Sequence, residues 1–557
     1  MLLTLLVGAV LSADRPPNVA TSLKGMVASV HPLATEAGVS ALQRGGNAID
    51  AAIAVGLTLG VVDSHNSGIG GGCFILIRRA DGQFFAIDGR EMAPSGASRD
   101  MYLRNGQPDP KLSQVGPLAV ATPGAIAAYA LALKQHGRLS LEDVILPAAK
   151  LAEDGFVINQ PFASSLARKA ADLRQVSGAD VPFLKPDGTP YAQGDMLKQR
   201  DLARTYRGIG ESGPAYFYRG PFAKDVGRWM AEHGGLLTTE DFANYQPVLR
   251  EPLITTYRGK TIVGFPPPSS GGVHVAEILN ILEPFDVAAI YRRDQGEYQH
   301  LLAEAMKLAF ADRAYWLGDP DFVRVPRGLA DKAYAQALAA RIDLTKATPV
   351  TTHGLPPAAD ENVFQKHTTH VAAADAAGNW VAMTQTVNTS YGSSVVVPGT
   401  GVVLNNEMDD FAIAPGTPNA FGLVGAEANA VAPLKRPLSS MSPTIVLVDG
   451  NPVMSVGAAG GPTIITQALQ ALVRRLDLGM TLAQSLAEPR IHHQWSPDAV
   501  RIESKLAEPL QQALTTRGHK LTPIGSMGVS QAIEYDAGSG LFTGAHDPRV
   551  PGKAAGP

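Results

Sequence analysis

The chain has 557 residues, of which 45% are hydrophobic and 18% charged, with a formal net charge of −4. This small charge is spread without basic runs, so it gives no reason to expect nucleic acid or a membrane surface as a partner. The single cysteine, Cys73, excludes an internal disulfide framework and a thiolate metal cluster, and its apolar neighbours predict a buried thiol.

The first residues are apolar and end in small side chains. Residues 1–13 resemble the hydrophobic part and the cleavage end of a secretory signal, although they lack a positively charged start and are shorter than usual. A segment of this length cannot span a membrane. We therefore expect residues 1–13 to be a signal peptide and the protein to be periplasmic or otherwise extracytoplasmic.

Between residues 32 and 62, apolar side chains recur at helical spacing on both sides of Gly45-Gly46, which predicts two core helices. The glycine-rich run Ser67–Phe74 follows. It lacks the Lys-Ser/Thr pair of a phosphate-binding loop, and an apolar strand, Cys73–Arg78, comes after it instead of a helix. Nucleotide binding is therefore not expected here.

A second strand is predicted at Phe84–Asp88, with Arg90 just beyond its end. A lone arginine in such a place is ordinarily a solvated surface charge. Residues 120–345 are mostly helical segments joined by Gly/Pro turns, interrupted by a strand-like hairpin at Leu253–Val263. In Tyr298–Leu317 the apolar residues form a stripe, which predicts a helix with one face in the core.

The polar, Pro-rich segment 348–362 is the only candidate break in the chain, and it is typical of an exposed linker. After it, two apolar runs (371–374 and 380–387) flank a turn sequence, Asp375–Asn379, which predicts a β-hairpin whose first strand begins at Thr368. Threonine is also common in β-strands, so a Thr-Thr pair at a strand start needs no catalytic explanation. These residues alone therefore leave a structural and a catalytic interpretation open.

The catalytic interpretation has a specific chemistry. If the bond between His367 and Thr368 breaks, Thr368 becomes N-terminal and its own α-amine can act as the base for its hydroxyl. An α-amine titrates at about 7.7–8.0, so a useful fraction is neutral near pH 7. One residue would then supply both the nucleophile and the base.

Five motifs follow one another in the C-terminal third of the chain: Thr368–His370, Thr386–Gly392, Leu404–Phe411, Lys435–Thr444 and Gly457–Gly461. In this order they resemble the gamma-glutamyltranspeptidase family, and Asp88–Pro94 and Ala303–Arg313 resemble signatures of that family's large subunit. The resemblance covers nearly the whole chain. It implies an α+β fold, the αββα four-layer sandwich of the N-terminal-nucleophile hydrolases.

The resemblance also implies autocatalytic processing of one precursor. Residues 14–367 would form the large subunit segment and residues 368–557 the small one, both within one structural unit, with the cut between His367 and Thr368. No cofactor is implied. The expected partners are γ-glutamyl compounds such as glutathione, together with amino acid or peptide acceptors.

Site roles follow from the matching motifs. By this resemblance, Thr368 would be the nucleophile, Thr386 would hydrogen-bond its hydroxyl, and the main chain of Gly460 and Gly461 would form the oxyanion hole. The Thr386-Val-Asn388 spacing would direct both polar side chains to one face of a strand. Asn388 would contact the α-amino and α-carboxylate end of the substrate.

The remaining implied residues bind that same end. Arg90, with a planar fork suited to a carboxylate, would hold the α-carboxylate together with Ser439 and Ser440. Glu407 and Asp410 would hold the α-ammonium, since a partly buried cation needs compensating carboxylates. Without the motifs around them, these two acids could equally be a turn-capping pair.

Residues 410–422 resemble the lid loop of many members of the family. Phe421 stands where the gating aromatic is often Tyr, so we expect a lid that is less firmly latched. His492-His493 could suggest a metal, but adjacent residues in a strand point apart and no third ligand is spaced with them, so no metal site is predicted.

The implied reaction is attack of Thr368 on a γ-glutamyl amide, giving an acyl-enzyme that water, an amino acid or a peptide resolves. One alternative is a cephalosporin (glutaryl) acylase on the same scaffold, against which the acidic pair and the lid argue. Another is an unprocessed, non-catalytic homologue, which would be expected to lose Thr368 or Gly460-Gly461. A conventional serine hydrolase is disfavoured because the sequence has no Gly-x-Ser-x-Gly elbow.

Overall fold

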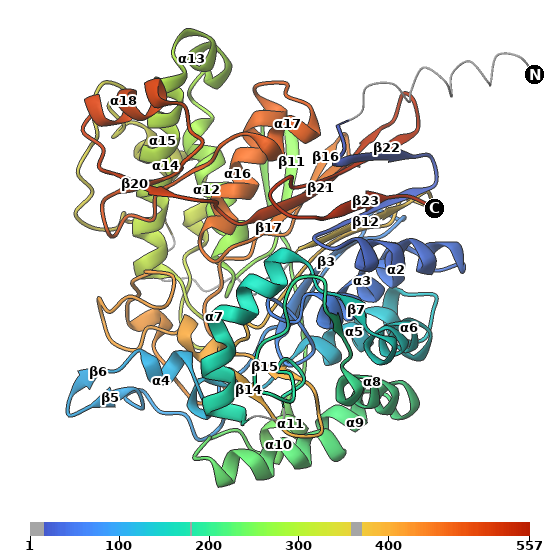
Figure 1. Ribbon diagram of the computed structural model, residues 1–557. Helices are drawn as coiled ribbons and strands as arrows, with labels where there is room; N and C mark the ends of the chain where they lie inside the picture. Colours follow the sequence, from blue (N-terminus) through green and yellow to red (C-terminus); the bar gives the residue numbers. More distant parts are fainter. Residues whose placement is uncertain (1–15, 179–180, 358–369) are drawn as a thin grey trace, which may run out of the picture.

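The computed structural model describes residues 16–178, 181–357 and 370–557. The expected signal segment, residues 1–13, and the expected cleavage site, His367–Thr368, lie outside these residues. Two large antiparallel sheets pack face to face, and helices cover the outer face of each (Figure 1). This helix–sheet–sheet–helix order confirms the predicted αββα, α+β fold class.

The first sheet has the strand order β23-β2-β12-β13-β3-β4-β9, with every neighbouring pair antiparallel. We call it the β13 sheet. The hairpin predicted around Asp375–Asn379 is confirmed as β12 and β13, near the centre of this sheet, although β12 begins only at Val371, after His370, and not at the predicted Thr368. Its strands are β2 (Gly25–Ser29), β3 (Gly72–Arg78), β4 (Phe84–Gly89), β9 (Val248–Arg250), β12 (Val371–Asp375), β13 (Trp380–Thr386) and β23 (Lys553–Ala555).

The second sheet, the β17 sheet, has the order β1-β22-β21-β17-β16-β11-β10 and is also antiparallel. Its β10–β11 pair is the hairpin predicted at Leu253–Val263. Each sheet takes strands from both sides of residue 367. The strands are β1 (Val19–Ser22), β10 (Leu253–Tyr257), β11 (Lys260–Gly264), β16 (Thr444–Val448), β17 (Asn451–Ala459), β21 (Val529–Asp536) and β22 (Leu541–His546).

Side chains alternate across the strands, as strand geometry requires. In β3, Phe74 and Leu76 enter the narrow core between the two sheets, whereas Ile75 and Ile77 face the helices. Both faces of the central strands are therefore buried. This explains why β12 reads as an unbroken apolar run and not as a polar–apolar alternation.

Helices α2 (Pro32–Gln43), α3 (Ala48–Val62), α5 (Ala125–His136) and α6 (Leu141–Asp154) belong to the layer over the β13 sheet. The break between α2 and α3 falls at the predicted Gly45-Gly46. A capping box starts α3: the Asn47 side chain accepts from the Asp50 N–H while the Asp50 carboxylate accepts from the Asn47 N–H. All fifteen residues of α3 are buried, and all except Asp50 and Thr58 are apolar or glycine, so this helix mainly supplies apolar support.

The opposite layer contains α12 (Ser270–Leu282), α14 (Gln295–Trp316) and α16 (Thr463–Leu476) (Figure 1). Helix α14 begins earlier than predicted because the Asp294 side chain accepts hydrogen bonds from the N–H groups of Gly296 and Glu297. Where α3 buries one charged side chain, Asp50, this helix buries several, among them Glu304, Lys307 and Arg313. The predicted apolar stripe is therefore only part of its buried surface.

Further helices wrap the two layers, and none among the described residues combines the length and apolar character that a membrane crossing requires. They are α4 (Lys111–Gln114), α7 (Gln160–Ser177), α8 (Arg200–Ser212), α9 (Pro214–Tyr218), α10 (Pro221–Glu232), α11 (Thr239–Asn244), α13 (Val287–Arg293), α15 (Lys332–Ala339), α17 (Leu482–Ala487) and α18 (Glu508–Thr516). The small strands are β5 (Leu103–Arg104), β6 (Gln107–Pro108), β7 (Phe156–Val157), β8 (Met196–Leu197), β14 (Val395–Val396), β15 (Val403–Leu404), β18 (Ile491–His492), β19 (Val500–Glu503) and β20 (Leu521–Ile524).

Candidate active site

A cavity of about 420 Å³ lies where β13 and β17, central strands of the two sheets, end. Most residues that the motifs singled out meet on its wall, although they come from distant parts of the chain. The predicted site residues that line it are Thr386, Asn388, Glu407, Asp410, Phe421, Ser439, Ser440, Gly460 and Gly461. Thr368 lies outside the described residues, but His370, two positions later, also lines the cavity.

The wall formed by the end of β13 differs from its predicted geometry. The strand ends at Thr386, and Asn388 has a left-handed backbone with φ of 74°. Strand alternation therefore does not relate the two side chains, and that argument was wrong. They reach the same cavity by a turn in which the Asn388 N–H donates to Thr386 Oγ1 at 2.7 Å and Asn388 Nδ2 donates to the Asn406 carbonyl at 2.9 Å.

The opposite wall is main chain. Gly460 and Gly461 form the turn between β17 and α16, with φ values of 135° and 60°, which an L-amino acid with a side chain rarely adopts. Within the described part of the chain, no acceptor takes either N–H. Two N–H groups at the start of a helix, facing a cavity, can stabilise a negative charge on a reacting oxygen.

His370 packs against this wall. A Cβ on Gly457 would lie 2.2 Å from Nδ1 of His370, so only glycine lets β17 pass so close to the ring. Burial lowers the pKa of His370 to about 3, which leaves the imidazole neutral. Neither ring nitrogen has a hydrogen-bond partner among the described residues. His370 belongs to the motif Thr368–His370, but the sequence predicted no role for it.

The other end of the cavity is ionic. Glu407 and Asp410 lie on a short 3₁₀ turn, and both accept hydrogen bonds from the guanidinium of Arg90: Nη1 donates to Glu407 Oε1, and Nη2 donates to Asp410 Oδ2 at 2.7 Å. Arg90 itself is fully buried and does not line the cavity. Its Nε donates to the carbonyl of Pro437 at 3.1 Å, so most of its donors already have protein partners.

A third carboxylate, that of Glu91, lies 3.7 Å from Arg90 Nη1 and is also fully buried. Burial raises the pKa of Glu91 to about 7 and that of Glu407 well above its ordinary value, although Arg90 opposes both shifts. Three acids thus surround one arginine. This end of the cavity therefore favours a ligand that brings a positive charge.

Ser439 and Ser440 are held in place by a separate loop, residues 266–272, which is one of the Gly/Pro turns predicted between residues 120 and 345. In this loop the Pro268 carbonyl accepts from the Ser439 N–H at 2.8 Å, and the Ser439 carbonyl accepts from the Ser270 N–H at 2.8 Å. Gly271 lets the two backbones touch, since a Cβ there would lie 2.0 Å from the Met441 carbonyl oxygen. The proline–glycine run 266–272 is therefore the support of the two serines.

Phe421 covers the main-chain wall: a Cβ on Gly461 would lie 2.6 Å from Cδ1 of the Phe421 ring. The loop that carries it is fastened through the backbone. Asn419 Oδ1 accepts from the Phe421 N–H at 3.0 Å, and Gln494 Nε2 donates to the Gly422 carbonyl at 2.8 Å. Backbone bonds of this kind need no phenol on the aromatic residue.

Two other predictions concern structural residues. Cys73 is fully buried, as expected, and burial raises the pKa of its thiol. In the glycine-rich run before it, a Cβ on Gly71 would lie 1.8 Å from the Thr386 carbonyl, so this run brings backbones together. His492 and His493 are both buried, and they contact Thr466 Oγ1 and Asp498 Oδ1 respectively.

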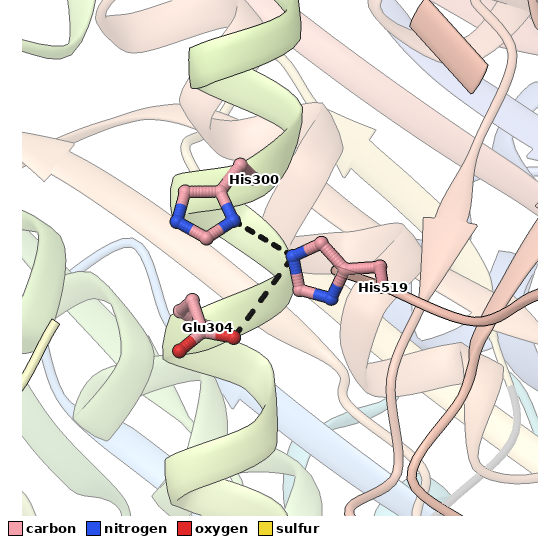
Figure 2. A group of neighbouring side chains, drawn as sticks. All are labelled: His300, Glu304 and His519. Atoms are coloured by element: carbon pink, nitrogen blue, oxygen red, sulfur yellow. Dashed lines mark hydrogen bonds and ion pairs between the residues drawn. The ribbon is translucent and has the colours of Figure 1, made fainter. Parts of the chain in front are cut away.

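One group among the described residues brings three metal-ligand types together: His300, Glu304 and His519 (Figure 2). His300 Nε2 donates to the Asp343 carbonyl, so its Nδ1 accepts from His519 Nε2 at 2.7 Å. Lys307 Nζ lies 2.7 Å from Glu304 Oε1 and already neutralises that carboxylate.

The remaining bonds of this group hold a loop. Glu304 Oε2 accepts from the Thr348 N–H at 2.9 Å, and Lys307 Nζ donates to the Thr348 carbonyl at 2.8 Å. We interpret the group as a buried network that fastens the start of the 348–362 segment to α14.

Sequence reasoning missed a polar stretch between α3 and the glycine run. Asp63, His65 and Asn66 line the cavity, and carbonyls of this stretch hold the turn that carries Asn388. The His65 carbonyl accepts from Tyr391 N–H at 2.8 Å, and the Asn66 carbonyl accepts from Val387 N–H at 3.2 Å. The only sequence signal was a cluster of polar residues directly after a mostly apolar helix.

The chain is similar to proteins of one family over most of its length. A family model described as Gamma-glutamyltranspeptidase matches residues 34–557. The chain is 44% identical to the glutathione hydrolase proenzyme of Escherichia coli (strain K12) over 528 residues, which are 94% of this chain and 90% of that protein.

Acylases are similar as well. The chain is 39% identical over 536 residues to the Acylase ACY 1 proenzyme of Pseudomonas sp. (strain V22), covering 94% of this chain and 92% of that protein. The crystal structure of a cephalosporin acylase from Bacillus halodurans superimposes with a TM-score of 0.86 at 30% identity, covering 98% of both chains. Overall similarity therefore leaves the substrate to be argued from the cavity.

Proposed function

Because the chain belongs to the gamma-glutamyltranspeptidase family, we propose that it cleaves the γ-glutamyl amide of glutathione and related compounds and passes the γ-glutamyl group to water, amino acids or peptides. The observation that carries this proposal is the ionic end of the cavity. Glu407, Asp410 and Ser440 stand where an ammonium and a carboxylate of one ligand could both be bound.

The proposed reaction starts with self-processing. Thr368 Oγ attacks the carbonyl of His367, and the ester formed is hydrolysed, so that Thr368 gains a free α-amine and His367 a carboxylate. The names of the similar proenzymes support such a step. The product would be two segments from one precursor, residues 14–367 and 368–557.

In turnover, the α-amine takes the proton of Thr368 Oγ while the oxygen bonds to the γ-carbonyl carbon. The negative charge that develops on the carbonyl oxygen would be met by the N–H groups of Gly460 and Gly461. When the C–N bond breaks, the proton goes to the leaving amine. Water or an acceptor amine then attacks the ester and releases the γ-glutamyl group.

The ionic end explains why a free α-amino acid terminus would be required. Burial raises the pKa of each of the three acids around Arg90, so one guanidinium does not offset the cost of burying their charges. An α-ammonium would supply a second positive charge, and Asn388, which is bonded to the Asn406 carbonyl next to Glu407, lines the same cavity. A glutaryl group has the same length but no ammonium, and it would leave the acids unpaired.

A cephalosporin acylase is the second candidate, supported by the similarity to two acylases. One comparison separates the candidates: kcat/KM for γ-glutamyl-p-nitroanilide against glutaryl-p-nitroanilide. The proposed function predicts a preference for the γ-glutamyl compound that can reach ~10⁴-fold. Equal turnover of the two, or a preference for the glutaryl compound, would favour the acylase.

A further inference from the structure

Arg313 belongs to the motif Ala303–Arg313 on α14, a part of the chain to which the proposed function gives no task. Only 5% of the residue is exposed. Its Nε donates to Ser270 Oγ at 2.9 Å, and its Nη2 donates to Ser440 Oγ at 3.0 Å. In the described part of the chain it forms no ion pair, which is unusual for a buried guanidinium.

The direction of the second bond determines what Ser440 can do. A guanidinium has donors only, so Ser440 Oγ must be the acceptor. The proton of the Ser440 hydroxyl is then left to donate elsewhere, and no described residue accepts it. Because Ser440 lines the cavity, that proton is available to an acceptor in the ligand, and a carboxylate oxygen is such an acceptor.

Charge supports the same conclusion. Arg90 is bonded to Glu407 and Asp410, so its positive charge is already compensated at the acidic end of the cavity. Arg313 lies directly behind Ser440, to which it is bonded. Burial lowers its pKa to about 10, with Asp410 opposing the shift, so it remains charged at neutral pH.

Resting on the proposed function, we propose that Arg313 is a positioning residue for the α-carboxylate of the substrate. It holds the Ser440 hydroxyl with its proton turned into the cavity and places a positive charge directly behind that hydroxyl. Substrate specificity at the carboxylate would then depend on α14, through a side chain that does not touch the substrate.

A purely structural role is the competing explanation. Through Ser270, Arg313 also steadies the loop 266–272, since Ser270 Oγ donates to the Ser439 carbonyl at 2.5 Å. If that were its whole purpose, loss of Arg313 would impair every substrate alike. If Arg313 acts on the carboxylate, only substrates that have one should suffer.

Three substrates of equal length separate these explanations: the p-nitroanilides of γ-glutamate, of 4-aminobutyrate, which lacks the α-carboxylate, and of glutarate, which lacks the α-ammonium. We expect Arg313→Gln to raise KM for the γ-glutamyl compound by ~10- to 100-fold, the range of a lost charge-assisted hydrogen bond, and to change kcat/KM for the 4-aminobutyryl compound by less than ~3-fold. An equal loss on both compounds would overturn the proposal.

Matched variants control for damage to the fold. Arg474 is a buried arginine of α16 bonded to backbone carbonyls away from the cavity, so Arg474→Gln measures the general effect of losing such a side chain. Arg313→Lys keeps the charge and should restore part of the affinity for the γ-glutamyl compound. If Arg313→Gln does not fold, Arg313→Lys is compared with Ser270→Ala. Arg313→Lys should then raise KM more for the γ-glutamyl than for the 4-aminobutyryl compound, whereas Ser270→Ala should affect both compounds alike.

A double-mutant cycle gives the sharpest test. If Arg313 acts through Ser440, then Arg313→Gln added to Ser440→Ala should raise KM by less than ~3-fold further. Independent, additive losses would overturn the proposal. Failure of the proposed function looks different: the wild-type protein itself would then show no preference for γ-glutamyl over 4-aminobutyryl and glutaryl substrates.

Discussion

The two ends of the cavity are formed by different parts of the polypeptide, main chain at one end and side chains at the other. At one end, Gly460 and Gly461 offer backbone N–H groups at the junction of a central strand and a helix. At the other, side chains from two segments far apart in the sequence, Arg90-Glu91 and the turn Glu407–Asp410, form a buried ionic cluster. The first end is made by the fold itself, whereas the second depends on a few exchangeable side chains.

Substitutions at the two ends of the cavity should therefore affect different kinetic parameters. Damage to the main-chain end should slow the chemistry for every acyl group, because the reacting bond is the same in all of them. Damage to the ionic end should mainly weaken binding, and only of substrates with a charged α-amino acid terminus. The following substitutions test this division, beginning with the largest expected effect.

For the chemical step, we expect Thr368→Ala to leave one uncut polypeptide. Turnover of every p-nitroanilide should fall by at least ~10⁴-fold, because the nucleophile and the base are lost together. The readouts are a denaturing gel and N-terminal sequencing. Thr369→Ala, which removes the neighbouring hydroxyl, is the control and should still be cut. A fully active single chain in the wild type would contradict the prediction.

At the ionic end, Asp410→Asn should reduce the preference for γ-glutamyl over glutaryl p-nitroanilide by ~100-fold, since the amide cannot neutralise an ammonium. Asp409→Asn is a matched control, because that carboxylate instead accepts from Ser113 Oγ at 2.8 Å. If the preference survives in Asp410→Asn, other residues than Glu407 and Asp410 recognise the ammonium.

For Arg90→Lys we expect KM for γ-glutamyl-p-nitroanilide to rise by ~10-fold or more while kcat changes little. Lysine keeps the charge, but its single ammonium cannot hold Glu407 and Asp410 in the planar, two-pronged geometry that Arg90 provides. Arg250→Lys, another buried arginine that bonds two acids, is the control. An unchanged KM would remove Arg90 from the site.

The last prediction concerns stability and its dependence on pH instead of turnover. The pKa of Glu91 is raised to about 7, so the folded state binds this proton more tightly than the unfolded state does. Such a group makes the folded state less stable as pH rises from its ordinary pKa of 4.5 through about 7. Between pH 5 and pH 8, this should remove up to ~3 kcal/mol from the free energy of unfolding.

Glu91→Gln should abolish that part of the pH dependence, as measured by denaturant unfolding at pH 5 and pH 8. The exposed Glu142 supplies the control, since Glu142→Gln should leave the pH dependence as in the wild type. An identical slope in wild type and Glu91→Gln would show that Glu91 titrates normally.

How much of this could be predicted from the sequence depended on the range of the interactions. Local signals were sufficient for the β12–β13 hairpin, for the break between α2 and α3, and for the strand pair β10–β11. The four-layer fold and the residues on the cavity wall came from ordered motifs, not from periodicity. Periodicity failed at Asn388, where a left-handed turn replaced the expected strand.

Long-range pairings could not be predicted. Arg90 bonds to acids more than 300 positions away, so the sequence could place each near the ligand without showing that they contact one another. The same holds for Arg313 and Ser440, which are 127 positions apart. On α14 the apolar stripe suggested only a core helix, because a pattern of hydrophobicity cannot reveal a buried charge whose partner is a distant serine.

The interleaved order of the strands has a consequence for the fate of a cut chain. Strand β12 pairs with β2, β13 pairs with β3, and β16 pairs with β11, so main-chain hydrogen bonds join the two sides of residue 367 in both sheets. Two fragments joined in this way cannot part as rigid bodies, because each would carry open strand edges into water. Dilution should therefore not dissociate a processed molecule, and its subunits should separate only when both unfold.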